Sequence, residues 1–170
     1  MKIVGIDAST NKTGVSVLQD GKYITHILID CHKEKDAMKR IPMMASKICE
    51  YLDGVESIDV IIMEKAMMKA GNVDTLQKLS NLAGAIMFYA YEHGIEFQHP
   101  MPSAWRKLVG LEQSSKVKRE TLKQEAIMAV EQEYGLKVSD DEAESILVAR
   151  SGFDLPKIEI SAEDAYWGQN

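Results

Sequence analysis

The segment Ile58–Met63, with the sequence IDVIIM, is the feature that most limits what this chain can fold into. A nearly continuous apolar run of this length is typical of a β-strand that is covered on both faces. Helical patterns flank it, because apolar residues recur at intervals of three and four over Lys35–Leu52 before it and over Val73–Ala90 after it. A buried strand between two amphipathic helices predicts an α/β domain whose sheet is covered by helices.

Further elements are predicted on both sides of this strand. Three strands precede it, the second and third joined by a hairpin signal at Asp20-Gly21. A short strand and two helices follow the second helix, and the sequence SDDE from Ser139 has the form of a capping box that opens a last helix, ending at Arg150. The predicted ranges, in chain order, are Lys2–Asp7, Thr13–Leu18, Lys22–Ile29, Ile95–His99, Pro102–Val109 and Lys116–Tyr134. We expect a single domain over residues 1–170, with no element assigned to residues 151–170.

Composition excludes several classes of protein. The chain has 170 residues, of which 45% are hydrophobic and 27% charged, as in ordinary globular domains. No apolar run approaches the ~20 residues that span a bilayer, and the N-terminus lacks a signal-peptide core, so we expect no membrane partner. Cys31 and Cys49 match neither a metal-binding spacing nor a disulfide framework, which favours a cytoplasmic protein with free thiols.

Charge is distributed unevenly along the chain. The formal net charge is -6, which argues against a polyanionic partner, yet the segment Ala104–Gln124 carries a net positive charge. Because the local potential steers a ligand, this segment is either a nucleic-acid-binding face or a solvated basic helix. Trp105, which stands at its start, is either a residue that stacks on a base or a packed helix residue.

Acidic residues stand at the ends of predicted elements. Asp7 closes the first strand, and the small residues Thr13 and Gly14 follow, an arrangement that leaves room for an ion or a phosphate beside the backbone. Glu64 ends the central strand, where sites in α/β sheets tend to lie. Each of these acids also has an ordinary structural explanation, since strands often end in a solvated carboxylate.

A further pair of acids, Asp141 and Glu144, shares one face in the first turns of the last helix. The helix dipole alone explains acids at this place, but together with Asp7 and Glu64 they form a set of four carboxylates. Oxygen-rich sites of this kind suit Mg²⁺ or Mn²⁺. Two such ions about 4 Å apart activate a water and stabilise the leaving oxygen of a phosphodiester.

The order of these features resembles that of the RuvC-type Holliday-junction resolvases. The resemblance runs from Lys2 to Arg150 and comprises a strand with Gly-Ile-Asp, a Thr-Gly pair, an acid-ended strand, a basic loop and a helix with Asp-x-x-acid. Its most specific stretch is Ile62–Gly84, IMEKAMMKAGNVDTLQKLSNLAG, where the acid-ended strand is followed by an Asn and a Leu-rich helix. The family implies a ribonuclease H-like fold with a central mixed five-stranded sheet, and the compact size fits a small, phage-type member.

This resemblance implies a function and a set of residues. The metal-binding catalytic acids would be Asp7, Glu64, Asp141 and Glu144, with Asp7 bridging two Mg²⁺ ions, for which Mn²⁺ would substitute. Lys116 would contact the cleaved phosphate, and the other DNA-binding residues would be Met67, Met68, Lys69, Arg106, Lys107, Lys118 and Arg119. The protein would be a homodimeric endonuclease of four-way and other branched DNA, in the cytoplasm of a bacterium or of a phage-infected host cell.

Two positions depart from the family pattern. Glu144 stands where Asp is usual, and Met67 stands where bacterial members often carry an aromatic residue that stacks at the junction crossover. Two other functions compete with cleavage. One is a junction-binding protein of the same fold that does not cut, although all four acids are retained. The other is an actin-like or sugar-kinase-like ATPase, which opens with the same motifs but needs two lobes around a nucleotide cleft.

Overall fold

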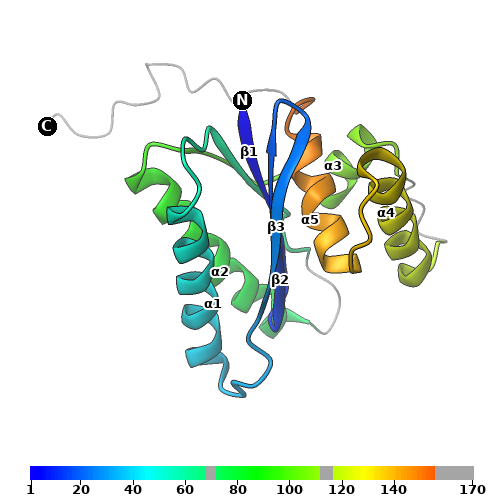
Figure 1. Ribbon diagram of the computed structural model, residues 1–170. Helices are drawn as coiled ribbons and strands as arrows, with labels where there is room; N and C mark the ends of the chain where they lie inside the picture. Colours follow the sequence, from blue (N-terminus) through cyan, green and yellow to red (C-terminus); the bar gives the residue numbers. More distant parts are fainter. Residues whose placement is uncertain (68–71, 112–116, 156–170) are drawn as a thin grey trace, which may run out of the picture.

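The computed structural model describes residues 1–67, 72–111 and 117–155, and its centre is a five-stranded sheet (Figure 1). The strand order is β3-β2-β1-β4-β5. The bounds are β1 (Lys2–Ala8), β2 (Lys12–Gln19), β3 (Lys22–Asp30), β4 (Val60–Met63) and β5 (Glu96–Gln98). The first three strands pair antiparallel, whereas β4 pairs parallel to β1 and β5 parallel to β4. The predicted mixed five-stranded sheet is therefore confirmed.

Helices cover both faces of this sheet. On one side lie α1 (Ala37–Asp53) and α2 (Val73–Glu92), and on the other α3 (Pro102–Leu108), α4 (Arg119–Tyr134) and α5 (Asp140–Ser151) (Figure 1). The predicted helices are confirmed to within a few residues, and Pro42 lies inside α1 without ending it. Within the part of the chain that the structure describes, no helix is both long enough and apolar enough to cross a membrane. Cys31 and Cys49 are free thiols.

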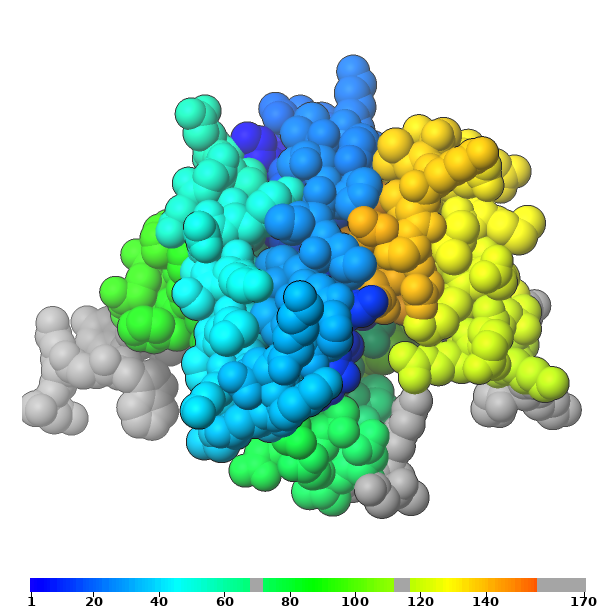
Figure 2. Space-filling model, turned by 60° about the horizontal axis from the view of Figure 1, so that its bottom comes forward, coloured from blue at the N-terminus to red at the C-terminus, as the bar shows by residue number. Residues whose placement is uncertain are grey.

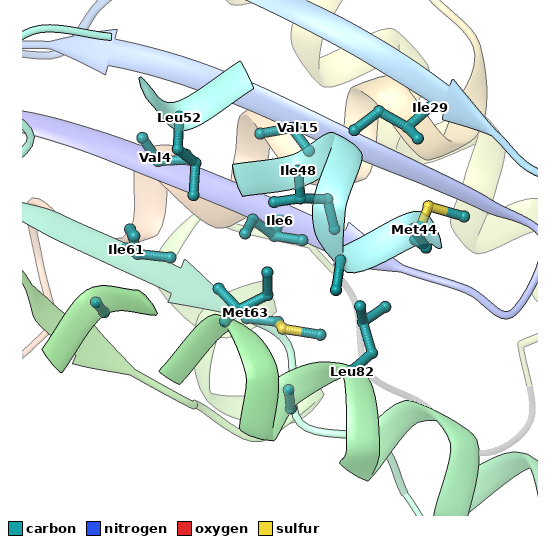
Figure 3. Packing of buried hydrophobic residues seen from close by; sticks show 14 of the residues in the cluster. Val4, Ile6, Val15, Ile29, Met44, Ile48, Leu52, Ile61, Met63 and Leu82 are labelled. Atoms are coloured by element: carbon teal, nitrogen blue, oxygen red, sulfur yellow. The ribbon is translucent and has the colours of Figure 1, made fainter. Parts of the chain in front are cut away.

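Two apolar cores enclose the sheet because side chains alternate between its faces. Figure 3 shows the first core, which lies between the sheet and the helices α1 and α2. Its labelled residues are Val4, Ile6, Val15, Ile29, Met44, Ile48, Leu52, Ile61, Met63 and Leu82. The second core, on the side of α3, α4 and α5, contains the alternate residues Ile3, Val60 and Ile62.

Because of the same alternation, two acids lie on the side of the sheet that α5 covers. Along β1, Ile3 lies in the core on the side of α5, so Asp7, four residues later, points to that side as well. Along β4, Ile62 lies in the same core, and Glu64 follows it two residues later. Because β1 and β4 are neighbouring parallel strands, their two final acids come to the same edge of the sheet.

Helix α5 lies directly against β1 and β2 because both strands carry a glycine where it crosses. A Cβ atom at Gly5 would lie 2.2 Å from the carbonyl oxygen of Ser145, and one at Gly14 would lie 2.2 Å from that of Asp141. Neither distance is physically accessible, so a side chain at either position would displace the helix. At Gly14 the helix itself fills the space that a side chain would take, and the room for an ion or a phosphate beside Asp7 stays a prediction.

Candidate active site

Three elements bring acidic residues to one end of the molecule, which lies at the bottom of Figure 1. Asp7 pairs with Gly14 across β1 and β2, and the backbone of Asp141 rests on that same glycine. The backbone N–H of Glu64 donates to the carbonyl oxygen of Ile6 at 3.3 Å. Figure 2 brings this end forward and shows dark blue N-terminal residues between the lighter blue of β3 and the yellow and orange of α4 and α5.

Asp7 is the electrostatic centre of this group. Burial raises the pKa of Asp7 from 3.8 to about 7, and the negative charges of Glu64 and Asp141 add to the effect. The positive charges of Lys123 and Arg106 act in the opposite direction but do not cancel it. A carboxyl group whose ionisation is opposed by two neighbouring acids gains much from a nearby cation.

Trp105 holds Glu64 in place. This residue of α3 is fully buried, and its indole N–H donates a hydrogen bond of 2.5 Å to Oε2 of Glu64. A hydrogen bond from a neutral donor orients a carboxylate and leaves its charge intact. Of the two interpretations of Trp105 from the sequence, that of a packed helix residue is confirmed.

Glu144 has a cationic partner inside the protein. Nη2 of Arg106 donates to Oε1 of Glu144, and both side chains are largely buried. The family resemblance places Arg106 among the DNA-binding residues; in the structure the residue is only 7% exposed and its guanidinium contacts Glu144. Because α3 has only seven residues, its helical period was too short to reveal which residues face the protein interior.

The remaining acids of the same motif stabilise the start of α5. The Glu142 carboxylate accepts the backbone N–H of Ser139 at 2.8 Å, as the predicted capping box requires, and forms an ion pair with His26 at 3.2 Å. Asp140 forms an ion pair with Lys123 of α4. These contacts fix the helix end from two sides and leave Asp141 on the side of Asp7.

The donor chemistry of the site fits a hard divalent cation, because Asp7, Glu64 and Asp141 supply only carboxylate oxygens and lie near enough for the charges of Glu64 and Asp141 to oppose the ionisation of Asp7. The group is not assembled as a ready ligand shell. Across residues 1–67, 72–111 and 117–155, no three Asp, Glu, His or Cys side chains lie close enough together to hold a metal ion. Glu144 in particular is engaged by Arg106.

The residues expected to bind DNA lie in different environments. Lys107, Lys118 and Arg119 are exposed at α3 and at the start of α4, and Met67 is exposed just after Glu64. The predicted contacts Met68, Lys69 and Lys116 lie outside the described residues. The exposed basic residues thus flank the acidic group on the side of α3 and α4.

Comparison with solved structures gives the same fold. The chain is similar to Thermus thermophilus RuvC in complex with a Holliday junction substrate, with 17% identity, coverage of 89% of this chain and 91% of that one, and a TM-score of 0.70. It is similar to the fowlpox virus resolvase in complex with Holliday junction DNA, with 16% identity, coverage of 89% and 98%, and a TM-score of 0.58. The yeast mitochondrial Holliday junction resolvase matches with 16% identity, coverage of 88% and 76%, and a TM-score of 0.52.

The sequence itself was compared with curated proteins and with family models. No curated protein matches the chain. The model of the crossover junction endodeoxyribonuclease RuvC family matches residues 3–149, which include Asp7, Glu64, Asp141 and Glu144. This match covers most of the chain and runs from the second residue of β1 into the last turn of α5. The chain therefore belongs to the crossover junction endodeoxyribonuclease RuvC family.

Proposed function

We propose that this protein resolves four-way DNA junctions as a homodimer, by metal-dependent nicking of two opposed strands. The observation that carries the proposal is that Glu64, which follows β4, and Asp141 of α5 lie near enough to Asp7, at the end of β1, to oppose its ionisation in a chain of this family. The substrate is proposed because two similar structures contain Holliday junction DNA.

The four acids have a shared role in this proposal. Asp7, Glu64, Asp141 and Glu144 would hold Mg²⁺ or Mn²⁺, two ions per site being expected. Metal ions held there would supply the activation of a water for attack on the phosphodiester and the stabilisation of its leaving oxygen. Trp105 keeps Glu64 oriented by its hydrogen bond. The products would be a 5′-phosphate and a 3′-hydroxyl, which a ligase can rejoin.

The exposed cations near the acids would hold the DNA backbone. Lys107, Lys118 and Arg119 are exposed beside the acidic group, where they offset the overall net charge of -6. Lys116 is proposed to contact the cleaved phosphate. Met67, Met68 and Lys69 are proposed to contact DNA near the crossover. An apolar Met67 would wedge between bases and not stack as an aromatic ring does, so cutting would occur at many sequences.

The outer face of α2 is the proposed dimer interface. Met87, Phe88 and Tyr91 are 52%, 64% and 79% exposed, although all three are large apolar or aromatic residues. Gly84 lies one turn before Phe88, and nothing would contact a Cβ atom there, so a second helix can approach closely. A two-fold dimer through this face would present two equal sites to the two opposed strands of a junction.

A cleavage assay with a single isosteric change tests the metal site. Glu64→Gln keeps the size of the side chain and its ability to accept from Trp105 but removes the charge. We expect junction cleavage in Mg²⁺ or Mn²⁺ to fall at least ~100-fold, a loss known from changes around metal sites, while junction affinity measured by gel shift is retained. The assay uses synthetic four-way, three-way, flap and linear DNA.

The matched control is Glu131→Gln, which makes the same change at an exposed position of α4. It should cut like the unchanged protein. Undiminished cleavage by Glu64→Gln would contradict the metal assignment. Binding of junctions without any cleavage by the unchanged protein would instead favour the non-cutting alternative.

A further inference from the structure

Two neighbouring residues of α3 contact two different acids of the site. The indole N–H of Trp105 donates to Glu64, and the guanidinium of Arg106 forms an ion pair with Glu144. The guanidinium carbon also lies 4.7 Å from the centroid of the Trp105 ring, so the cation is stacked on the indole. The two contacts differ in kind, because only the one to Glu144 neutralises a carboxylate.

Arg106 is a buried cation that forms an ion pair with Glu144 and is also influenced by three other acids. Asp7 and Glu64 act on it from the ends of β1 and β4, and Glu125 acts on it from α4. Its second terminal nitrogen, Nη1, is buried and has no hydrogen-bond partner among the described residues. The Glu125 oxygen Oε2 is likewise buried and without a partner in that part of the chain. An unpaired donor and an unpaired acceptor of opposite charge thus lie in one region beside the site.

We propose that Arg106 is the resident counter-cation of the site, that it competes with a divalent cation for Glu144, and that Glu125 receives the guanidinium when Glu144 is released. The inference rests on the proposed function, since it takes Glu144 as a metal ligand. It assigns roles to two residues, Arg106 and Glu125, that are neither DNA-binding nor metal-binding. Both act as positioning residues through Glu144.

Competition follows from the charges and the burial. A guanidinium cannot lose its proton in a protein, so it keeps its charge whether or not a metal ion is present. A buried carboxylate that has lost its cation is strongly unfavourable, so Glu144 needs either Arg106 or a metal ion. Glu125 offers the guanidinium an alternative partner, and this lowers the penalty for releasing Glu144.

Metal binding to the DNA-free protein tests the competition. The variant Arg106→Gln removes the charge, and Lys107→Gln removes the same charge from the next, exposed residue of the same helix. We expect Mn²⁺ affinity in calorimetry to rise ~10-fold in Arg106→Gln, within the usual range of coupling between linked equilibria, and to stay unchanged in Lys107→Gln. The melting temperature in EDTA should fall in Arg106→Gln and recover with Mn²⁺.

A second variant should change the Mn²⁺ affinity in the opposite direction. Glu125→Gln leaves the pair between Arg106 and Glu144 intact but removes the acid that receives the guanidinium, so Mn²⁺ affinity should fall. It also keeps the proposal testable if Arg106→Gln does not fold. Unchanged or weaker Mn²⁺ binding in a folded Arg106→Gln, or unchanged binding in Glu125→Gln, would overturn the competition. If the unchanged protein cuts junctions but neither variant alters Mn²⁺ affinity, the competition is refuted and the proposed function stands. If the unchanged protein does not bind Mn²⁺, the competition and the proposed function are both refuted.

Discussion

At the scale of single residues, the chemistry of the site depends on which face of the sheet each acid occupies. The positions of Asp7 and Glu64 at strand ends were predictable from sequence, because the apolar residues of both strands are easily recognised. The internal partners Trp105 and Arg106 were not, since the hydrogen bond from Trp105 of α3 to Glu64, just after β4, joins residues 41 positions apart. Their contacts come from the packing of α3 against α5 beside the end of β4, which no local pattern encodes.

The raised pKa of Asp7 predicts how the stability of the metal-free protein depends on pH. The folded protein binds the proton of the Asp7 carboxyl more tightly than the unfolded chain does. The contribution of this group to the free energy of unfolding is therefore fully present below about pH 4 and is lost as the pH rises toward 7. A shift of roughly three units corresponds to up to ~4 kcal/mol. Asp7→Asn should therefore be more stable than the unchanged protein at pH 8 in EDTA, and the difference should vanish near pH 4.

Urea unfolding in EDTA at pH 4, 6 and 8 measures this difference. The control Asp154→Asn alters an exposed acid that pairs with Arg150 and should show no such gain at pH 8. Equal stability of Asp7→Asn and the unchanged protein at pH 8 would show that neither burial nor the charges of Glu64 and Asp141 oppose the ionisation of Asp7.

At the scale of elements, the candidate site depends on the direct contact of the α5 backbone with β1 and β2, where no side chain separates the helix from the strands. The sequence predicted the strands, the helices and the capping box at Ser139, since each has a local signature of period, turn or cap. It did not predict the approach of α5 to Gly5 and Gly14. A glycine within a strand has several explanations, and only the packed structure shows which one applies.

The variant Gly14→Ala tests this close approach. Its Cβ atom would overlap the Asp141 carbonyl oxygen, which belongs to a helix backbone and cannot rotate away. We expect a loss of about 1–3 kcal/mol in the free energy of unfolding, the usual effect of overpacking, together with loss of cleavage because Asp141 moves away from Asp7. Urea unfolding and the junction assay measure the two effects.

Gly54→Ala is the matched control for that change. Its added Cβ would make only an ordinary contact of 3.4 Å, with the Tyr51 carbonyl oxygen. It should leave both stability and cleavage nearly unchanged. A Gly14→Ala protein with the stability and activity of this control would show that α5 does not need glycine at that position.

At the scale of the whole molecule, a single chain carries one site, and a four-way junction has two equivalent strands to cut. In the proposed dimer, two chains would associate through the exposed residues of α2. Phe88→Glu should shift the protein from dimer to monomer in sedimentation, because it places a charge in the apolar interface. Met128→Glu makes a comparable change at a residue of α4 that is 66% exposed, and it should remain dimeric. A dimeric Phe88→Glu protein would place the interface elsewhere.

The most direct measurement of the proposed function is the position of every cut on a four-way junction with all four strands labelled, in Mg²⁺. A symmetric dimer with one acidic site per chain should nick two opposed strands at positions related by the two-fold axis of the junction, and ligase should seal both nicked products. Cuts in one strand only, or at a fixed distance from the branch without a partner cut, would contradict the assignment of this protein as a symmetric junction resolvase.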